Sequence, residues 1–217
     1  MSPTVTRGLV FLLTIAIGLG IVAPQLAAVR VDRASDSCYA RALRWLDTGR
    51  PERAVDELRT MIRFQPNVAE YHLMLGRAYQ AVYDSARGEY GREGQESFWE
   101  IAEEYLIARS LRSDDFDIAR EYATHLLRAE EFGMTPNWEE ALSAWQYCLV
   151  IAEEQYERDP SYWYFSSLKA SVLFQLGRIE LKRNRHDSAR GYLTEVLNIM
   201  PESHAARVLL SRTNHDR

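Results

Sequence analysis

Histidine and cysteine are the side chains with most to offer a metal ion or a reactive centre, and their spacing here argues against both roles. The chain has five histidines and two cysteines in 217 residues. No two histidines are spaced as His-x-x-x-His, and Cys38 and Cys148 stand 110 positions apart instead of forming Cys-x-x-Cys. We therefore expect no metal site. Cys148 lies at an apolar helical position seven residues after Ala141, which favours a buried free thiol over a disulfide.

Carboxylates are numerous, and several form adjacent pairs such as Glu103–Glu104 and Glu153–Glu154. Neighbouring residues of a helix point about 100 degrees apart, so such pairs mostly lie on its solvent face and do not form an acid–base dyad. The glycines within residues 84–97 are followed by no Lys-Ser/Thr, so this segment is not a phosphate-binding loop. We expect no catalysis, no cofactor and no small-molecule substrate. The alternative is an enzyme that uses carboxylates of residues 84–97 or of a groove.

The composition limits the partners. The formal net charge is −5, and 47% of the residues are hydrophobic. Because the chain lacks an excess of basic residues, nucleic acid is a poor candidate as a partner. The hydrophobic content is sufficient for a folded core.

The N-terminal region differs from the rest of the chain. Residues 8–29 contain no charged side chain, which predicts a transmembrane helix. We predict an anchor over residues 1–30, a polar linker over 31–37 and a soluble domain over 38–217. The protein would then span the bacterial inner membrane once, with its domain on the extracytoplasmic side. The alternative is a cleaved signal peptide and a secreted or periplasmic protein.

Small residues and prolines with one shared spacing predict how the rest of the chain folds. Two sets, each spaced by twelve positions, are Ala42, Ala54 and Pro66, and Gly177, Ala189 and Pro201. This spacing is typical of two short amphipathic helices that cross closely where the small residues meet, followed by a proline that ends the pair.

Periodic apolar residues and breaks at Gly, Pro and Asn extend this pattern to four helix pairs and a last helix. The predicted pairs are 38–47 with 51–64, 68–83 with 98–111, 116–130 with 138–158, and 162–182 with a helix that ends before Pro201; the last helix is 203–212. Residues 84–97 form an insertion in the second pair. The predicted fold class is all-α: stacked helix pairs, closed by a capping helix and preceded by one N-terminal transmembrane helix.

These pairs resemble the tetratricopeptide repeat family, whose 34-residue helix-turn-helix units stack into a curved solenoid. The resemblance covers about residues 36–212 and implies about four repeats plus a capping helix. It also implies a concave groove that binds an extended or helical peptide of a partner protein. The groove-facing positions would be Tyr39, Leu43, Leu73, Arg77, Phe174 and Arg178. The Lys and Asn pattern with which some members bind a terminal carboxylate is absent. Arg77 and Arg178 would either receive an acidic partner segment or remain solvated.

Aromatic residues gather where helix 138–158 meets helix 162–182, two helices that are longer than a repeat requires. They include Tyr162, Trp163 and Tyr164. Aromatic side chains in an overhang often anchor a partner, because they bury a large area at a small cost in rotamer entropy. The alternative is that they pack the extra turns against each other.

Together these patterns predict a non-catalytic, membrane-anchored scaffold that binds a protein partner. We expect the scaffold to act as an accessory or assembly subunit of a larger membrane or envelope complex.

Overall fold

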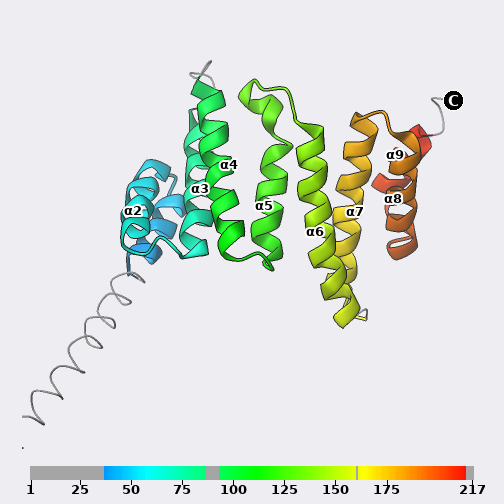
Figure 1. The fold of residues 1–217 in the computed structure, drawn as a ribbon, viewed down its shortest axis with the longest axis horizontal. Helices are drawn as coiled ribbons and strands as arrows, with labels where there is room; N and C mark the ends of the chain where they lie inside the picture. The colour runs from blue at the N-terminus through cyan, green and yellow to red at the C-terminus, as the bar shows by residue number, and fades with distance from the viewer. Residues whose placement is uncertain (1–36, 87–92, 160, 214–217) are drawn as a thin grey trace, which may run out of the picture.

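The computed structural model describes residues 37–86, 93–159 and 161–213, and the regular secondary structure of these residues is helical throughout (Figure 1). Residues 37–47 form the first helix. The elements that follow are α2 (Pro51–Phe64), α3 (Ala69–Ser85), α4 (Glu93–Leu111), α5 (Phe116–Leu126), the 3-10 helix η1 (Ala129–Phe132), α6 (Trp138–Arg158), α7 (Trp163–Lys182), α8 (His186–Ile199) and α9 (His204–Arg212). The prediction of an all-α chain is confirmed.

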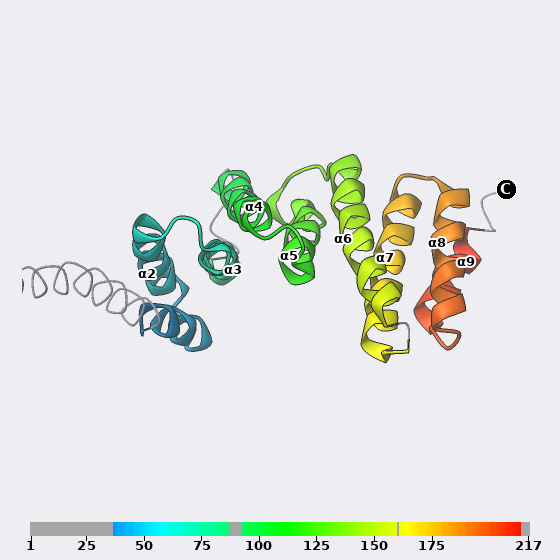
Figure 2. The ribbon, with the colours of Figure 1, turned by 60° about the horizontal axis from the view of Figure 1, so that its bottom comes forward.

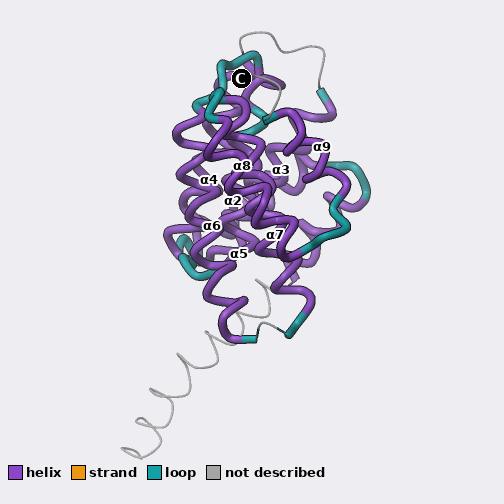
Figure 3. Tube along the Cα trace, turned by 90° about the vertical axis from the view of Figure 1, so that its right-hand side faces the viewer, coloured by secondary structure: helices purple, strands orange, loops and turns teal. Residues whose placement is uncertain are grey.

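The helices stand side by side in chain order along the molecule (Figures 1 and 2). Their main contacts join consecutive elements, from α2 with α3 to α8 with α9. Figure 3 looks along this row, so that the helices overlap one behind another. A row in which each unit packs on its neighbours is a solenoid. The predicted stack of helix pairs is therefore confirmed.

Small residues lie where the helices of a pair cross. Ala54 and Ala189 are completely buried, each with 0% of its surface exposed. A Cβ atom on Gly177 would lie 2.9 Å from Cγ of Leu193 and 3.6 Å from the carbonyl oxygen of Ala189. Helices α7 and α8 thus approach closely at the positions that the spacing predicted.

The turns inside these two pairs also match. Gly49 and Asn184 each lie five positions before the central alanine, and both adopt the left-handed conformation, with φ of 67° and 57°. Glycine and asparagine tolerate this conformation better than other residues do. The same turn therefore reverses the chain in the first and fourth pairs.

The second pair makes the crossing contact with a different residue. A Cβ atom on Gly76 would lie 2.6 Å from the ring of Tyr105. Tyr105 thus occupies the place that Leu193 has opposite Gly177. The two residues of this contact are 29 positions apart in the second pair and 16 in the fourth. The second pair therefore contains the insertion that the sequence predicted.

The insertion itself is more helical than expected. Residues 84–97 were predicted to lie between helices, but α3 extends into this segment and α4 begins within it; residues 87–92 lie outside the described residues. One physical reason is packing at the start of α4. Gly94 is buried, and a Cβ atom there would lie 3.2 Å from the carbonyl oxygen of Phe132 and 3.5 Å from the hydroxyl of Tyr83, which stacks on Phe132 with ring centroids 3.9 Å apart.

Helix α5 is shorter than the predicted helix 116–130. It ends at Leu126, and the chain then turns into η1, which Gly133 terminates with φ of 70°. Phe132, at the end of η1, is only 1% exposed. If α5 continued beyond Leu126, the ring of Phe132 would point in another direction. Burial of Phe132 therefore explains why the chain turns into η1.

The prediction of a transmembrane helix, and with it of a single-pass inner-membrane protein, is contradicted. Among the described residues, no helix combines the length and the apolar content needed to cross a bilayer. Residues 8–29, to which the prediction referred, lie outside the described part of the chain, as does the boundary at residue 30.

His125, in α5, is a titratable side chain that is buried in the central core. Its ring is 2% exposed, Nε2 lies 2.9 Å from the carbonyl oxygen of Phe98, and the two rings stack with centroids 4.4 Å apart. In the neutral form Nε2–H donates to that carbonyl. Burial disfavours the cation and lowers the pKa of His125 to about 4.

The crossing contacts predict that substitution by alanine destabilises the protein at two glycines and stabilises it at a third. Gly76→Ala and Gly177→Ala should each lower the free energy of unfolding by about 1–3 kcal/mol, because the added methyl group overlaps a buried neighbour. Gly191→Ala, in α8, is the matched control, because nothing lies within 4 Å of its added Cβ. It should stabilise the protein by about 0.5–1 kcal/mol. Denaturant unfolding measures all three, and equal effects would contradict the crossing geometry.

The lowered pKa of His125 predicts a loss of stability in mild acid. The unfolded state binds a proton near pH 6.5, whereas the folded state resists it until about pH 4. Stability is therefore complete above pH 6.5 and falls as the pH drops towards 4, by roughly 3 kcal/mol at that end. Unfolding measured across this range should show a loss larger by about this amount in wild type than in His125→Gln, because carboxylates with a lowered pKa, such as Glu57, contribute an acid loss to both proteins. Parallel curves would contradict the prediction.

Candidate partner-binding site

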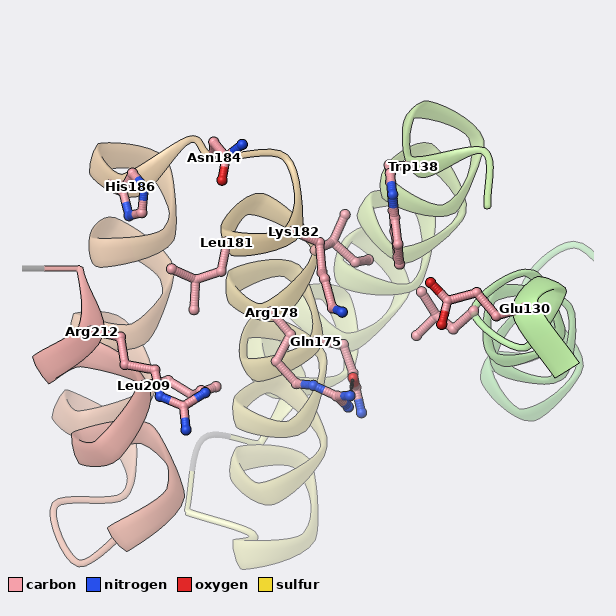
Figure 4. Close-up of a pocket in the computed structure, with 12 residues that line it drawn as sticks. Glu130, Trp138, Gln175, Arg178, Leu181, Lys182, Asn184, His186, Leu209 and Arg212 are labelled. Atoms are coloured by element: carbon pink, nitrogen blue, oxygen red, sulfur yellow. Dashed lines mark hydrogen bonds between the residues drawn. The ribbon is translucent and has the colours of Figure 1, made fainter. Parts of the chain in front are cut away.

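A cleft of about 520 Å³ opens between α7 and α9, in the C-terminal half of the row (Figure 4). Helix α7 is the first helix of the last pair, and α9 is the capping helix. Of the predicted groove positions, Arg178 lines this cleft. The residues after α5, the start of α6 and the turn between α7 and α8 complete its lining.

Helix α7 supplies two cations to the cleft. Arg178 and Lys182 are four residues apart and so share one face of the helix. Ile179 also lines the cleft but is 1% exposed, so it forms an apolar floor beside the charged groups. The same helix thus presents charge to the opening and apolar surface to the core.

Helix α9 supplies a third cation from the opposite wall. Arg212 follows Arg178 by 34 positions, the length of one repeat, and both line the cleft. Arg178 donates a hydrogen bond from Nη1 to Oε1 of Gln175 at 2.9 Å. Within the described part of the chain, Arg178, Lys182 and Arg212 form no ion pair with a carboxylate.

The remaining wall is acidic and aromatic. Figure 4 shows Glu130 on the side away from Arg212, with Lys182 and Trp138 between them. Glu130 is the one carboxylate among the lining residues. The described lining is therefore net positive, in a chain whose formal net charge is −5.

The predicted groove positions of the N-terminal half are engaged in packing or pairing. Arg77 donates to Glu121 of α5 at 2.6 Å. Leu73 packs partly buried against the central core, and Tyr39 and Leu43 pack against the N-terminal core cluster. In the C-terminal half Phe174 packs against the cluster formed by α7, α8 and α9.

The structure thus brings Arg178 together with two residues that the sequence did not single out, Lys182 and Arg212. The sequence did contain a sign that Arg212 lies near Arg178, because Arg212 repeats the position of Arg178 one unit later. The position of Lys182 became informative only once the cleft was known.

The predicted aromatic residues form an exposed overhang between α6 and α7, and we call Tyr162, Trp163 and Tyr164 the aromatic overhang. Their exposed fractions are 46%, 71% and 42%. The ring centroids of the three lie 6.1–6.3 Å from one another. Phe165, by contrast, is partly buried, and Tyr162 packs edge-on against its ring at 5.1 Å. Most of the overhang therefore remains accessible.

The groups considered for catalysis have structural neighbours. Asp84, at the start of the insertion, lies 2.8 Å from Arg128. Both cysteines are free thiols; Cys148 is 0% exposed, and burial raises its pKa to about 12. Within the described residues, no group of three histidine, cysteine or acidic side chains is arranged to hold a metal ion.

No protein-family model and no curated protein matches this chain by sequence. Solved structures do match it by fold. A MamA structure (residues 41 to the end) from Desulfovibrio magneticus RS-1 has a TM-score of 0.59 and 16% identity, over 83% of each chain. A tetratricopeptide repeat protein from Parabacteroides merdae has a TM-score of 0.60 and 15% identity, over 84% of this chain and 60% of that one.

A third structure, a T3SS complex from Aeromonas hydrophila, has a TM-score of 0.53 and 17% identity, over 70% of this chain and 84% of that one. At such low identities the likeness concerns the fold alone. It shows that the chain has a tetratricopeptide-like fold, as the family resemblance implied.

The burial of Cys148 predicts that its thiol does not react in the folded protein. In a Cys38→Ser variant, iodoacetamide should leave Cys148 unmodified under native conditions and alkylate it completely in denaturant, because only the exposed thiolate reacts. Mass spectrometry of the intact chain measures both states. Rapid native alkylation would show that the position is accessible.

Proposed function

We propose that this protein is a non-catalytic scaffold that binds a protein partner and acts as an accessory or assembly subunit of a larger complex. The observation that carries the proposal is the aromatic overhang, where three consecutive large side chains remain exposed and Trp163 is 71% exposed. Clustered exposed apolar side chains typically mark interaction surfaces.

Packing of the extra turns does not account for this exposure. Leu168, one turn further along α7, is 8% exposed and belongs to the central core. Its neighbours in the core explain why α6 and α7 stay together near their ends. Trp163 contributes little to that contact, because most of its surface is accessible to solvent. A partner that covers the overhang would bury this area.

The proposal includes the predicted groove. In the C-terminal half, Arg178 lines the cleft between α7 and α9, and Phe174 lies one turn earlier on α7. In the N-terminal half, Tyr39, Leu43, Leu73 and Arg77 are half-buried, so part of each remains available to a bound segment. The described fold, a row of helix pairs with an open side, suits a long contact with another polypeptide.

The neighbours support this class of function without defining it. One similar structure is described as a complex. Because that likeness concerns only the fold, an assembly role for this chain rests on its own exposed surface.

Replacement of the overhang tests the proposal. The double variant Trp163→Ala and Tyr164→Ala should weaken binding to the native partner by on the order of 2 kcal/mol, about thirtyfold, because truncated anchors no longer bury their area. Its thermal melting should stay close to that of wild type. Trp99→Ala is the matched control, because Trp99 is 53% exposed on α4, away from the overhang. It should leave binding unchanged.

The partner can be identified in the same experiment. A photo-reactive benzoylphenylalanine at position 164 of the full chain, activated in the source cells, should crosslink one discrete polypeptide, and the same residue at position 99 should not. If the double variant melts markedly earlier yet still captures the same polypeptide, the overhang is core and the proposal fails.

A further inference from the structure

Charge is distributed unevenly between the C-terminal cleft and its surroundings. The cations that adjoin the cleft without facing it are neutralised. Arg183 pairs with Glu139 and, at 3.1 Å, with Glu180. Arg190 lies 2.9 Å from Asp187.

The cations that face the cleft lack such partners. Arg178, Lys182 and Arg212 form no ion pair with a carboxylate among the described residues, although Glu130 lines the same cleft. Three like charges around one hollow repel each other, and an anionic group that enters between them relieves this repulsion.

The neighbouring first helix explains why Arg77 has a carboxylate partner, whereas Arg178 has none among the described residues. Both follow a Leu-Gly dipeptide on the first helix of a pair. Arg77 is satisfied by Glu121 from the next first helix, at 2.6 Å. The next first helix after Arg178 is α9, and it presents Arg212 instead of a carboxylate. Within the described residues, Arg178 thus has no counterpart of the carboxylate that α5 supplies to Arg77.

The cleft continues beyond these cations. A second hollow of about 400 Å³ shares Asn184 and His186 with it. Its lining adds Arg185 from the turn between α7 and α8, and Asp187 and Arg190 from α8. The anionic segment thus has room to enter at one end and leave at the other. A site built for a chain terminus would instead be closed at one end.

We propose that this cleft binds an internal acidic segment of a partner polypeptide, whose carboxylates pair with Arg178 and Lys182 on α7 and with Arg212 on α9. Charge-assisted hydrogen bonds from guanidinium to carboxylate supply the recognition. The half-buried side chains of Leu181, Leu209 and Trp138 line the same cleft and accept apolar side chains between the acidic ones. This inference rests on the proposed scaffold function and names the chemistry of the segment bound.

A random library of 12-residue peptides, fused at both ends to a carrier protein, tests the proposal with the full chain. Selection on wild type should enrich Asp and Glu. Selection on Arg178→Glu with Arg212→Glu should lose this enrichment. Arg44→Glu with Arg63→Glu is the matched control, because both arginines are exposed and lie on the first two helices, away from the cleft; it should select as wild type does.

The peptide most enriched, synthesised with both ends blocked, gives the affinity by fluorescence anisotropy. Arg178→Glu with Arg212→Glu should weaken binding at least tenfold, and added salt should weaken binding to wild type. Equal binding to both proteins, no acidic enrichment, or a requirement for a free C-terminal carboxylate would overturn the proposal. So would equal competition by a single-stranded oligonucleotide, because the ligand would then be a phosphate polymer.

The two proposals fail in different ways. Trp163→Ala with Tyr164→Ala lies outside the cleft and should bind the selected peptide as wild type does. Loss of acidic selectivity together with intact crosslinking at position 164 refutes the cleft and leaves the scaffold standing. If the peptide still binds but no partner is crosslinked at position 164, the role of the overhang is refuted and the cleft proposal stands.

Discussion

The close crossing within each helix pair is the contact on which the rest of the structure depends. At Gly177 and Gly76 the absence of a side chain lets Leu193 and Tyr105 come within reach of the neighbouring backbone. The helices of a pair consequently pack closer than larger residues allow. Because each pair contacts mainly its neighbours, the packing within one pair determines where the next pair lies in the row.

That arrangement determines which side chains meet at the surface. Helices α7 and α9 bring Arg178, Lys182 and Arg212 to one cleft, although these two helices are not consecutive in the chain. The extra turns of α6 and α7 carry the aromatic overhang beyond the contacts that bury apolar residues elsewhere. Both candidate binding surfaces therefore follow from helix length and crossing geometry, and neither requires a special loop or a bound ion.

Local signals accounted for much of the fold. The spacing of Gly177, Ala189 and Pro201 identified a helix pair, because a crossing needs small residues at set intervals. The second pair was harder, since Tyr105 replaces leucine and the helices lengthen through part of the insertion. The change of path after α5 was missed because it depends on burial of Phe132 against Tyr83, 49 positions earlier. The transmembrane helix was predicted from an uncharged run alone, and no described helix bears it out.

The sequence by itself determined that this chain forms helix pairs and that they stack, because the period of apolar residues and the position of small ones are local properties. Only the tertiary structure decided which charges are free. Arg77 and Glu121 are 44 positions apart and pair, whereas Arg178 shares its cleft with a second arginine, Arg212, from the next first helix. Electrostatic pairing depends on distances between side chains of different repeats, and these distances exist only after the helices have packed.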